Sequence, residues 1–176
     1  MLKTVLLVIS GIVILTLAVI LVLAAMKPDT FRVERSVTIH AGPEKIYPLI
    51  ADYHAWRAWS PFETDPAMQR SYGGAESGAG AVYEWDGKGV GSGRMETLEA
   101  STARIVIKLD FFKPFRTTNK ASFTLEPQGA DTKVTWVMEG PVTFLPKIMH
   151  VVFNMDKMVG GEFDKGLAKL KAVAEK

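Results

Sequence analysis

The sequence predicts an α+β domain preceded by a single membrane-spanning helix. Three observations lead to this class. An uncharged run extends from Thr4 to Met26, and alternating apolar and polar segments follow with short, turn-rich connections. The C-terminal segment then carries apolar residues at spacings of three and four. These patterns indicate an apolar helix, an antiparallel sheet and an amphipathic helix that can cover one face of the sheet.

The uncharged run of 23 residues lies between Lys3 and Lys27. As a helix it would be roughly 35 Å long at 1.5 Å per residue, against about 30 Å of bilayer hydrocarbon. Two alanines near the end of the run make a cleavable signal peptide the alternative. The apolar core of a signal peptide is usually about 7–15 residues long, however, and this run is longer. We therefore expect a retained single-pass anchor over residues 1–27 and one domain over residues 28–176.

The side of the membrane is poorly specified, because basic residues flank the run at both ends. The lysine that leads the run favours the extracytoplasmic side for the domain. Only residues 27–30 connect the anchor to the first expected strand. At about 3.3 Å per residue this linker holds the domain within roughly 13 Å of the bilayer.

The domain is expected to begin with a strand at residues 31–39, where apolar and polar residues alternate. A short helix should follow from Pro43, with Ile46 and Ile50 on its apolar face. A second short helix or turn is expected over residues 56–62.

Six further strands are expected, most of them separated by turns that contain glycine, proline or aspartate. They are Met68–Tyr72, Ala81–Trp85, Gly93–Ala100, Ala103–Phe112, Thr118–Glu126 and Lys133–Glu139. Their connections are too short for parallel crossovers, so all seven strands should be antiparallel. A long helix from about Phe144 to Ala174 would close the fold. Gly160 and Gly161 interrupt its apolar stripe, and they would let it bend or approach the sheet closely.

The composition excludes several classes of function. The formal charge of +2 is small and the basic residues are scattered, so we expect no nucleic-acid partner. The chain has no cysteine, which excludes disulfides and thiolate sites. Its three histidines lie in unrelated segments without metal-binding spacing, so we expect no metal and no cofactor.

Four groups of residues together carry a family resemblance. They are Trp56-x-x-Trp59-Ser60-Pro61-Phe62, Gly80-x-x-Tyr83-x-Trp85, Val134-Thr135-Trp136-x-Met138-x-Gly140 and Gly161-x-Phe163-x-x-Gly166-Leu167-x-x-Leu170. The chain resembles the SRPBCC (START/Bet v 1-like) superfamily, and more narrowly the membrane-anchored polyketide cyclase/dehydrase-like proteins. The resemblance covers the chain from Phe31 to the C-terminus. It implies a helix-grip fold, in which a curved sheet wraps the C-terminal helix and leaves a cavity. Members bind lipids, sterols or polyketides, and a minority catalyse cyclisation or related reactions.

Aromatic residues and methionines are the candidate ligand contacts. Tyr83 and Trp85 share one face of a strand, as do Trp136 and Met138, because alternate residues of a strand point the same way. The expected cavity lining comprises Trp59, Tyr83, Trp85, Trp136, Met138, Met149, Phe153 and Met155. The alternative is that these side chains only fill the core. By the same parity, Glu84 and Glu139 should face solvent, so no catalytic residue is expected.

One expected hairpin tip, residues 111–116, combines three phenylalanines with two cations. This composition is typical of a loop that enters a membrane interface. The candidate contacts are Phe112, Phe115 and Arg116. In the alternative, Phe111 or Phe112 belongs to the strand core and only Phe115 is exposed.

The leading hypothesis is a membrane-tethered module that binds an apolar small molecule or lipid. One alternative is a cyclase- or dehydrase-like enzyme acting on polyketide or aromatic substrates. This enzyme would need at least two convergent polar or titratable groups in the cavity. Another alternative is an interaction protein that docks on a membrane complex, for which no protein partner can be named.

Overall fold

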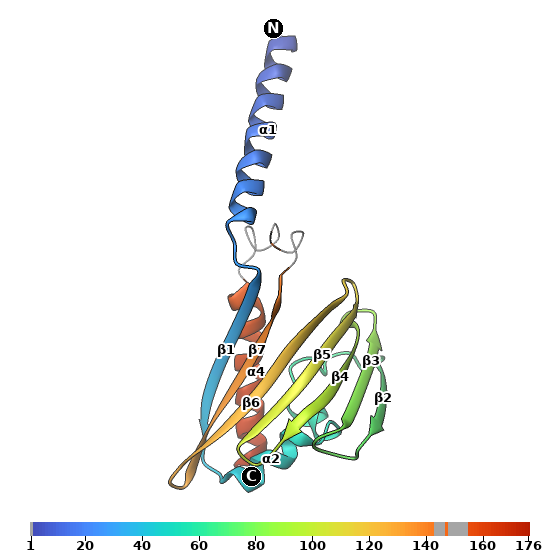
Figure 1. Cartoon of the computed structure of the whole chain (residues 1–176), viewed down its shortest axis with the longest axis vertical. Helices are drawn as coiled ribbons and strands as arrows, with labels where there is room; N and C mark the ends of the chain where they lie inside the picture. Colours follow the sequence, from blue (N-terminus) through green and yellow to red (C-terminus); the bar gives the residue numbers. More distant parts are fainter. Residues whose placement is uncertain (1, 143–146, 148–154) are drawn as a thin grey trace.

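The computed structural model describes residues 2–142, 147 and 155–176. Its first element is helix α1, Leu2–Ala25, which extends away from the rest of the chain (Figure 1). The helix has a mean hydropathy of 3.2 over its apolar window, and none of that window is buried. By length and composition it can cross a membrane.

The domain is built on one seven-stranded antiparallel sheet in the order β1-β7-β6-β5-β4-β3-β2. The strands are β1 Thr30–Ile39, β2 Gln69–Gly74, β3 Ala81–Gly87, β4 Gly91–Ala100, β5 Arg104–Lys113, β6 Thr117–Gln128 and β7 Asp131–Pro141. Consecutive strands from β2 to β7 form hairpins, and β1 pairs with β7. The predicted sheet is confirmed.

Several strands are longer than their hydropathy patterns indicate. Strand β7, for example, starts at Asp131 and reaches Pro141, beyond the predicted range 133–139. The added residues are paired by the backbone ladder with the ends of β1 and β6. Backbone pairing does not need an apolar side chain, so alternation understates strand length.

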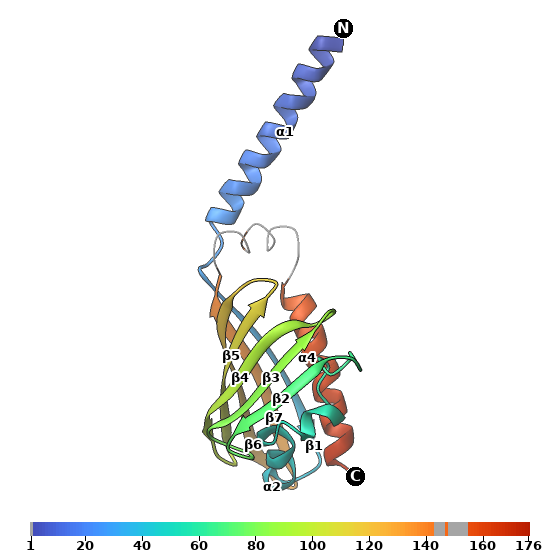
Figure 2. The same cartoon turned by 90° about the vertical axis from the view of Figure 1, so that its right-hand side faces the viewer.

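Two short helices follow β1, as predicted. Helix α2, Pro43–Ala51, has a proline at its start and buries Ile46 and Ile50. A 3₁₀ helix, η1 Ala55–Ala58, comes next and buries Trp56. Helix α2 lies at the end of the domain that is far from α1 (Figure 2).

Helix α4, Met155–Ala174, lies across one face of the curved sheet (Figure 2). Its side chains Phe163, Leu167 and Leu170 are buried in the core, which confirms the predicted apolar stripe. The predicted start near Phe144 falls outside the described residues. The helix-grip architecture is therefore present, with the sheet wrapped around the C-terminal helix.

Gly160 and Gly161 were predicted to let the helix bend or approach the sheet closely, and α4 runs as one helix through both. A Cβ atom on Gly160 would lie 2.1 Å from Nη2 of Arg35. The guanidinium of Arg35 crosses the helix there, and its Nη1 lies 2.9 Å from Oδ1 of Asp156. Gly160 therefore allows close approach between α4 and the sheet. Because glycine has no side chain, Arg35 of β1 can cross the helix there and pair with Asp156 in its first turn.

Candidate ligand-binding cavity

A cavity of about 340 Å³ lies between the sheet and the first half of α4. Side chains of β3 to β7, of the loop between η1 and β2, and of α4 line it. Small-molecule pockets usually measure about 300–1,000 Å³ and are mostly apolar, so this cavity is at the small end of that range. Glu63 is the one charged side chain among its described lining residues.

Four of the predicted contact residues line this cavity: Tyr83, Trp85, Trp136 and Met138. They come from β3 and β7, which lie far apart in the sheet order. Strand alternation placed each pair on one face, and the curvature of the sheet brings the two faces toward the same space. The structure thus brings these four residues together, and contact with a ligand stays a prediction.

Of the other predicted lining residues, the structure describes only the side chain of Trp59. Trp59 is fully buried, and its Nε1 donates a hydrogen bond of 2.7 Å to the carbonyl oxygen of Leu49. It is a core residue outside the cavity lining. Met149 and Phe153 lie outside the described residues, as does the side chain of Met155, whose backbone begins α4.

A glycine on the neighbouring strand positions Trp85. Trp85 of β3 is opposite Gly93 of β4, and a Cβ atom on that glycine would lie 2.4 Å from Cη2 of the indole. The ring therefore lies across the bare backbone of β4. It also meets Phe111 of β5 edge to face, with ring centroids 5.8 Å apart. Phe111 is half-buried and lines the cavity beside Trp85, although the sequence did not single it out for this role.

An aromatic stack centred on Trp136 contributes to the cavity lining. Its ring lies parallel to Phe163 of α4, with centroids 3.9 Å apart and an interplanar angle of 4°. Phe123 of β6 also stacks on Trp136, with ring centroids 4.9 Å apart. A Cβ atom on Gly166 would lie 3.0 Å from Cζ3 of Trp136 and 2.8 Å from Cδ of Pro61. Glycine therefore lets α4 approach this stack closely.

A polar network forms one wall of the cavity, and the sequence did not predict it. The Tyr83 hydroxyl donates a hydrogen bond of 2.6 Å to Oε1 of Glu63. The Glu63 Oε2 atom accepts from Nε of Arg70 at 2.8 Å and lies 2.7 Å from Nη2. The side chains of Glu63 and Arg70 are only 6% and 14% exposed. No periodic pattern marks Glu63, which lies in a loop, so only the tertiary structure identifies it.

The surroundings of Tyr83 shift its pKa upward. Burial raises the pKa of the Tyr83 hydroxyl far above its usual value, and the hydrogen bond to Glu63 raises it further. The hydroxyl is the donor in this hydrogen bond. Arg70 also donates to the backbone oxygens of Met68 and Asp65, so its guanidinium holds the loop that forms this wall.

The strand carboxylates lie outside the cavity, as parity predicts. The Glu84 side chain is 51% exposed and pairs with Arg94. Glu139 faces solvent too, and a hydrogen bond from Lys120 lowers the pKa of its carboxyl group. Within the described residues, no group of three or more histidines and carboxylates could hold a metal ion.

The hairpin between β5 and β6 exposes both of its candidate phenylalanines. Phe112 is 43% exposed and Phe115 is 55% exposed. Exposure of Phe115 alone is therefore wrong, whereas Phe111 packs against the core, as that alternative allowed. Parity explains the difference, because Phe111 points into the cavity and its neighbour must point outward.

Comparisons with known proteins agree with this architecture. A family model described as polyketide cyclase / dehydrase and lipid transport matches residues 30–175. No curated protein sequence matches the chain at a significant level.

Solved structures of similar fold share little sequence with the chain. The X-ray structure of protein CV1439 from Chromobacterium violaceum is 18% identical, with a TM-score of 0.59 over 85% of this chain and 99% of that one. DynU16, a protein in the dynemicin biosynthetic locus, is 14% identical with a TM-score of 0.59, over 85% of this chain and 48% of its own. Ara h 8.0201 is 12% identical with a TM-score of 0.54, over 82% of this chain and 97% of its own. At these identities the likeness extends to the fold alone.

Proposed function

Because the chain belongs to the polyketide cyclase / dehydrase and lipid transport family, we propose that its domain binds an apolar small molecule or lipid while α1 tethers it to a membrane. The observation that carries this proposal is the cavity of about 340 Å³ under α4. Its walls are mainly aromatic and aliphatic, which is the usual lining of a site for an apolar ligand.

The size of the cavity limits the range of ligands that can fit. A volume near the lower limit for small-molecule sites suits one acyl chain or a compact polycyclic molecule better than a whole two-chain lipid. Glu63 and Tyr83 add a polar wall to this otherwise apolar space. We therefore expect a ligand with one small polar group on a predominantly apolar body.

The tether is supported by the length and apolarity of α1. After α1 ends at Ala25, a turn follows in which the N–H of Lys27 bonds to the carbonyl oxygen of Ala24. Asp29 is already part of the domain, because its carbonyl oxygen accepts from the N–H of Val142 at 2.7 Å. Pro28 is thus the only residue between this turn and the domain, and the domain would stay at the lipid surface. We propose the extracytoplasmic side for it.

The test uses full-length protein purified in a mild detergent. Native mass spectrometry would detect a retained ligand, and titration with a fluorescent fatty acid would measure binding. Ala121 of β6 lines the cavity, so Ala121→Phe should occupy the space and abolish binding of the probe. Its neighbour Ser122 lies on the opposite face, which makes Ser122→Phe the matched control. Absence of both retained ligand and probe binding, or equal binding by Ala121→Phe, would overturn the proposal.

A second candidate function is a cyclase- or dehydrase-like enzyme on a polyketide or aromatic substrate. The observation in its favour is the pair of titratable groups, Glu63 and Tyr83, on the cavity wall. Both carboxylate oxygens of Glu63 are already engaged, however, by Tyr83 and Arg70. This arrangement suits positioning better than proton transfer. Conversion of an aromatic polyketide surrogate that is lost in Glu63→Gln would establish the enzyme, whereas binding without conversion would leave the binding module.

A further inference from the structure

The β5–β6 hairpin tip, residues 112–116, carries two exposed aromatic rings and two cations. Phe112 and Phe115 are 43% and 55% exposed, and neither takes part in the core. Lys113 and Arg116 are exposed beside them, and the tip contains no acidic residue. Aromatic rings flanked by cations are the composition of segments that enter the headgroup region of a bilayer.

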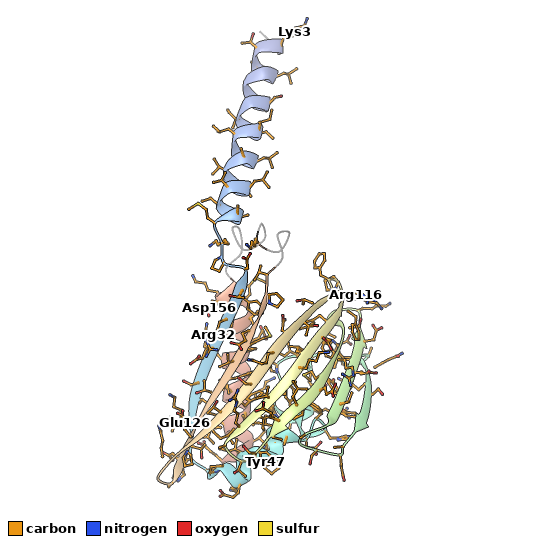
Figure 3. All side chains as sticks on the ribbon, viewed as in Figure 1. Lys3, Arg32, Tyr47, Arg116, Glu126 and Asp156 are labelled. Atoms are coloured by element: carbon orange, nitrogen blue, oxygen red, sulfur yellow. The ribbon has the colours of Figure 1, made fainter. Side chains whose placement is uncertain are left out.

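The tip also lies at the end of the domain that is nearest to the membrane helix α1. Figures 1 and 2 both place the β5–β6 turn at the end of the domain that α1 leaves, and the C-terminus at the opposite end. Arg116 lies at this anchor-side end in Figure 3, whereas Glu126, near the other end of the same strand, lies far from it. With only Pro28 as a free connection, the anchor-side end cannot move far from the lipid.

The cavity lies next to this tip. A Cβ atom on Gly91, the first residue of β4, would lie 2.4 Å from the carbonyl oxygen of Lys113, so the start of β4 packs directly on the hairpin. Val90, which precedes it in the β3–β4 turn, and Phe111 of β5 both line the cavity. The part of the cavity wall made by β3, β4 and β5 is therefore continuous with the exposed tip.

We propose that the β5–β6 tip inserts into the lipid surface as a second membrane contact, with Phe112 and Phe115 among the headgroups and acyl-chain ends and Arg116 paired with lipid phosphate. The inference rests on the tether in the proposed function, but not on the identity of the ligand. Two contacts, α1 and the tip, fix the orientation of the domain. They place the wall formed by Val90 and Phe111 at headgroup level, so an apolar ligand passes from the leaflet to the cavity over a short path. A lipid surface suits the tip better than a protein partner, because the exposed cation of Arg116 matches the anionic phosphates of lipids, whereas Lys113 is paired with Asp86 at 3.2 Å.

The absence of cysteine from the chain permits a direct test. Full-length Phe115→Cys is labelled with the environment-sensitive fluorophore NBD and reconstituted in vesicles of phosphatidylcholine, alone or with phosphatidylglycerol. Glu126→Cys, at the opposite end of β6, is the matched control. Lipids that carry a shallow doxyl group then report contact by quenching. Flotation of the protein with the vesicles reports the tether separately.

We expect a blue-shifted and doxyl-quenched signal from position 115 and neither effect at position 126. In phosphatidylglycerol vesicles, Arg116→Gln in the Phe115→Cys chain should lower the ratio of inserted to free tip about fivefold, the effect of one cation at an anionic surface. If the chain floats but position 115 is quenched no more than position 126, the tip proposal is overturned and the tether stands. A blue shift without quenching means burial against protein and also overturns it. Failure to float overturns the tether itself.

Discussion

The ion pair between Glu63 and Arg70 offers the sharpest test of how the cavity wall is held. In Arg70→Met the side chain keeps much of its apolar length but loses its charge and all its donors. Glu63 would then keep only the hydrogen bond from Tyr83, in a site where its side chain is 6% exposed. A buried carboxylate without its cation is one of the costlier defects that a single substitution can create.

The expected loss follows from that burial. Removing one partner of a buried ion pair typically costs about 3–5 kcal/mol of unfolding free energy. The bonds from Arg70 to the carbonyl oxygens of Met68 and Asp65 are lost as well. In Glu63→Gln/Arg70→Met no charge is left, and the amide oxygen still accepts from Tyr83. We therefore expect the double variant to recover most of the loss, to within about 1–2 kcal/mol of the parent protein.

The assay is urea unfolding of the full-length chain in detergent, followed by tryptophan fluorescence. With a slope of about 2 kcal/mol per M, the Arg70→Met midpoint should fall by roughly 1.5–2.5 M. Arg32→Met is the matched control, because Arg32 also contacts two carboxylates but its side chain is 54% exposed. Its expected loss is about 1 kcal/mol or less. The reasoning is refuted if Arg70→Met costs no more than Arg32→Met, or if the double variant is as unstable as Arg70→Met.

Three further outcomes are expected. Gly93→Ala would place a Cβ atom 2.4 Å from the Trp85 ring and 2.5 Å from a backbone oxygen of β5, so urea unfolding should show a loss of about 3 kcal/mol, and a loss below 1 would contradict this packing. Gly160→Ala should displace Arg35, so Arg35→Met should lower the urea midpoint in the parent but have no further effect in the Gly160→Ala background. Burial raises the pKa of Tyr53 to about 12. The unfolded chain ionises this hydroxyl from about pH 10, so between pH 10 and 12 Tyr53 should remove about 1.4 kcal/mol of stability per pH unit. Tyr53→Phe should flatten the fall in urea midpoint over that window, and an unchanged slope would contradict the prediction.

The sequence predicted the sheet and its inward face well because both depend on local alternation. Tyr83 and Trp85, or Trp136 and Met138, share a face whatever lies elsewhere in the chain. The ends of strands were less predictable, since backbone pairing extends them through polar residues and proline. Residue type alone did not separate cavity lining from core. Trp59 was predicted to line the cavity, but it is fully buried in the core.

The glycines could not be interpreted from the sequence with the same accuracy. Gly160 lies in a helix that it neither bends nor ends, and its role depends on Arg35, which lies 125 positions earlier in the numbering (160 − 35). Gly93 likewise makes room for a tryptophan on the neighbouring strand. Such roles depend on side chains that only folding brings near.

The uncharged run, the strand alternation and the helical stripe by themselves determined an apolar helix long enough to span a membrane, a seven-stranded antiparallel sheet and a covering helix, because each is a periodic pattern within one segment. Only the tertiary structure decided the rest. The volume of the cavity, the network of Glu63, Arg70 and Tyr83, and the position of the β5–β6 tip beside the anchor-side end depend on packing between distant segments. Periodicity records which face a residue takes, whereas a cavity depends on how much space the opposing side chains leave.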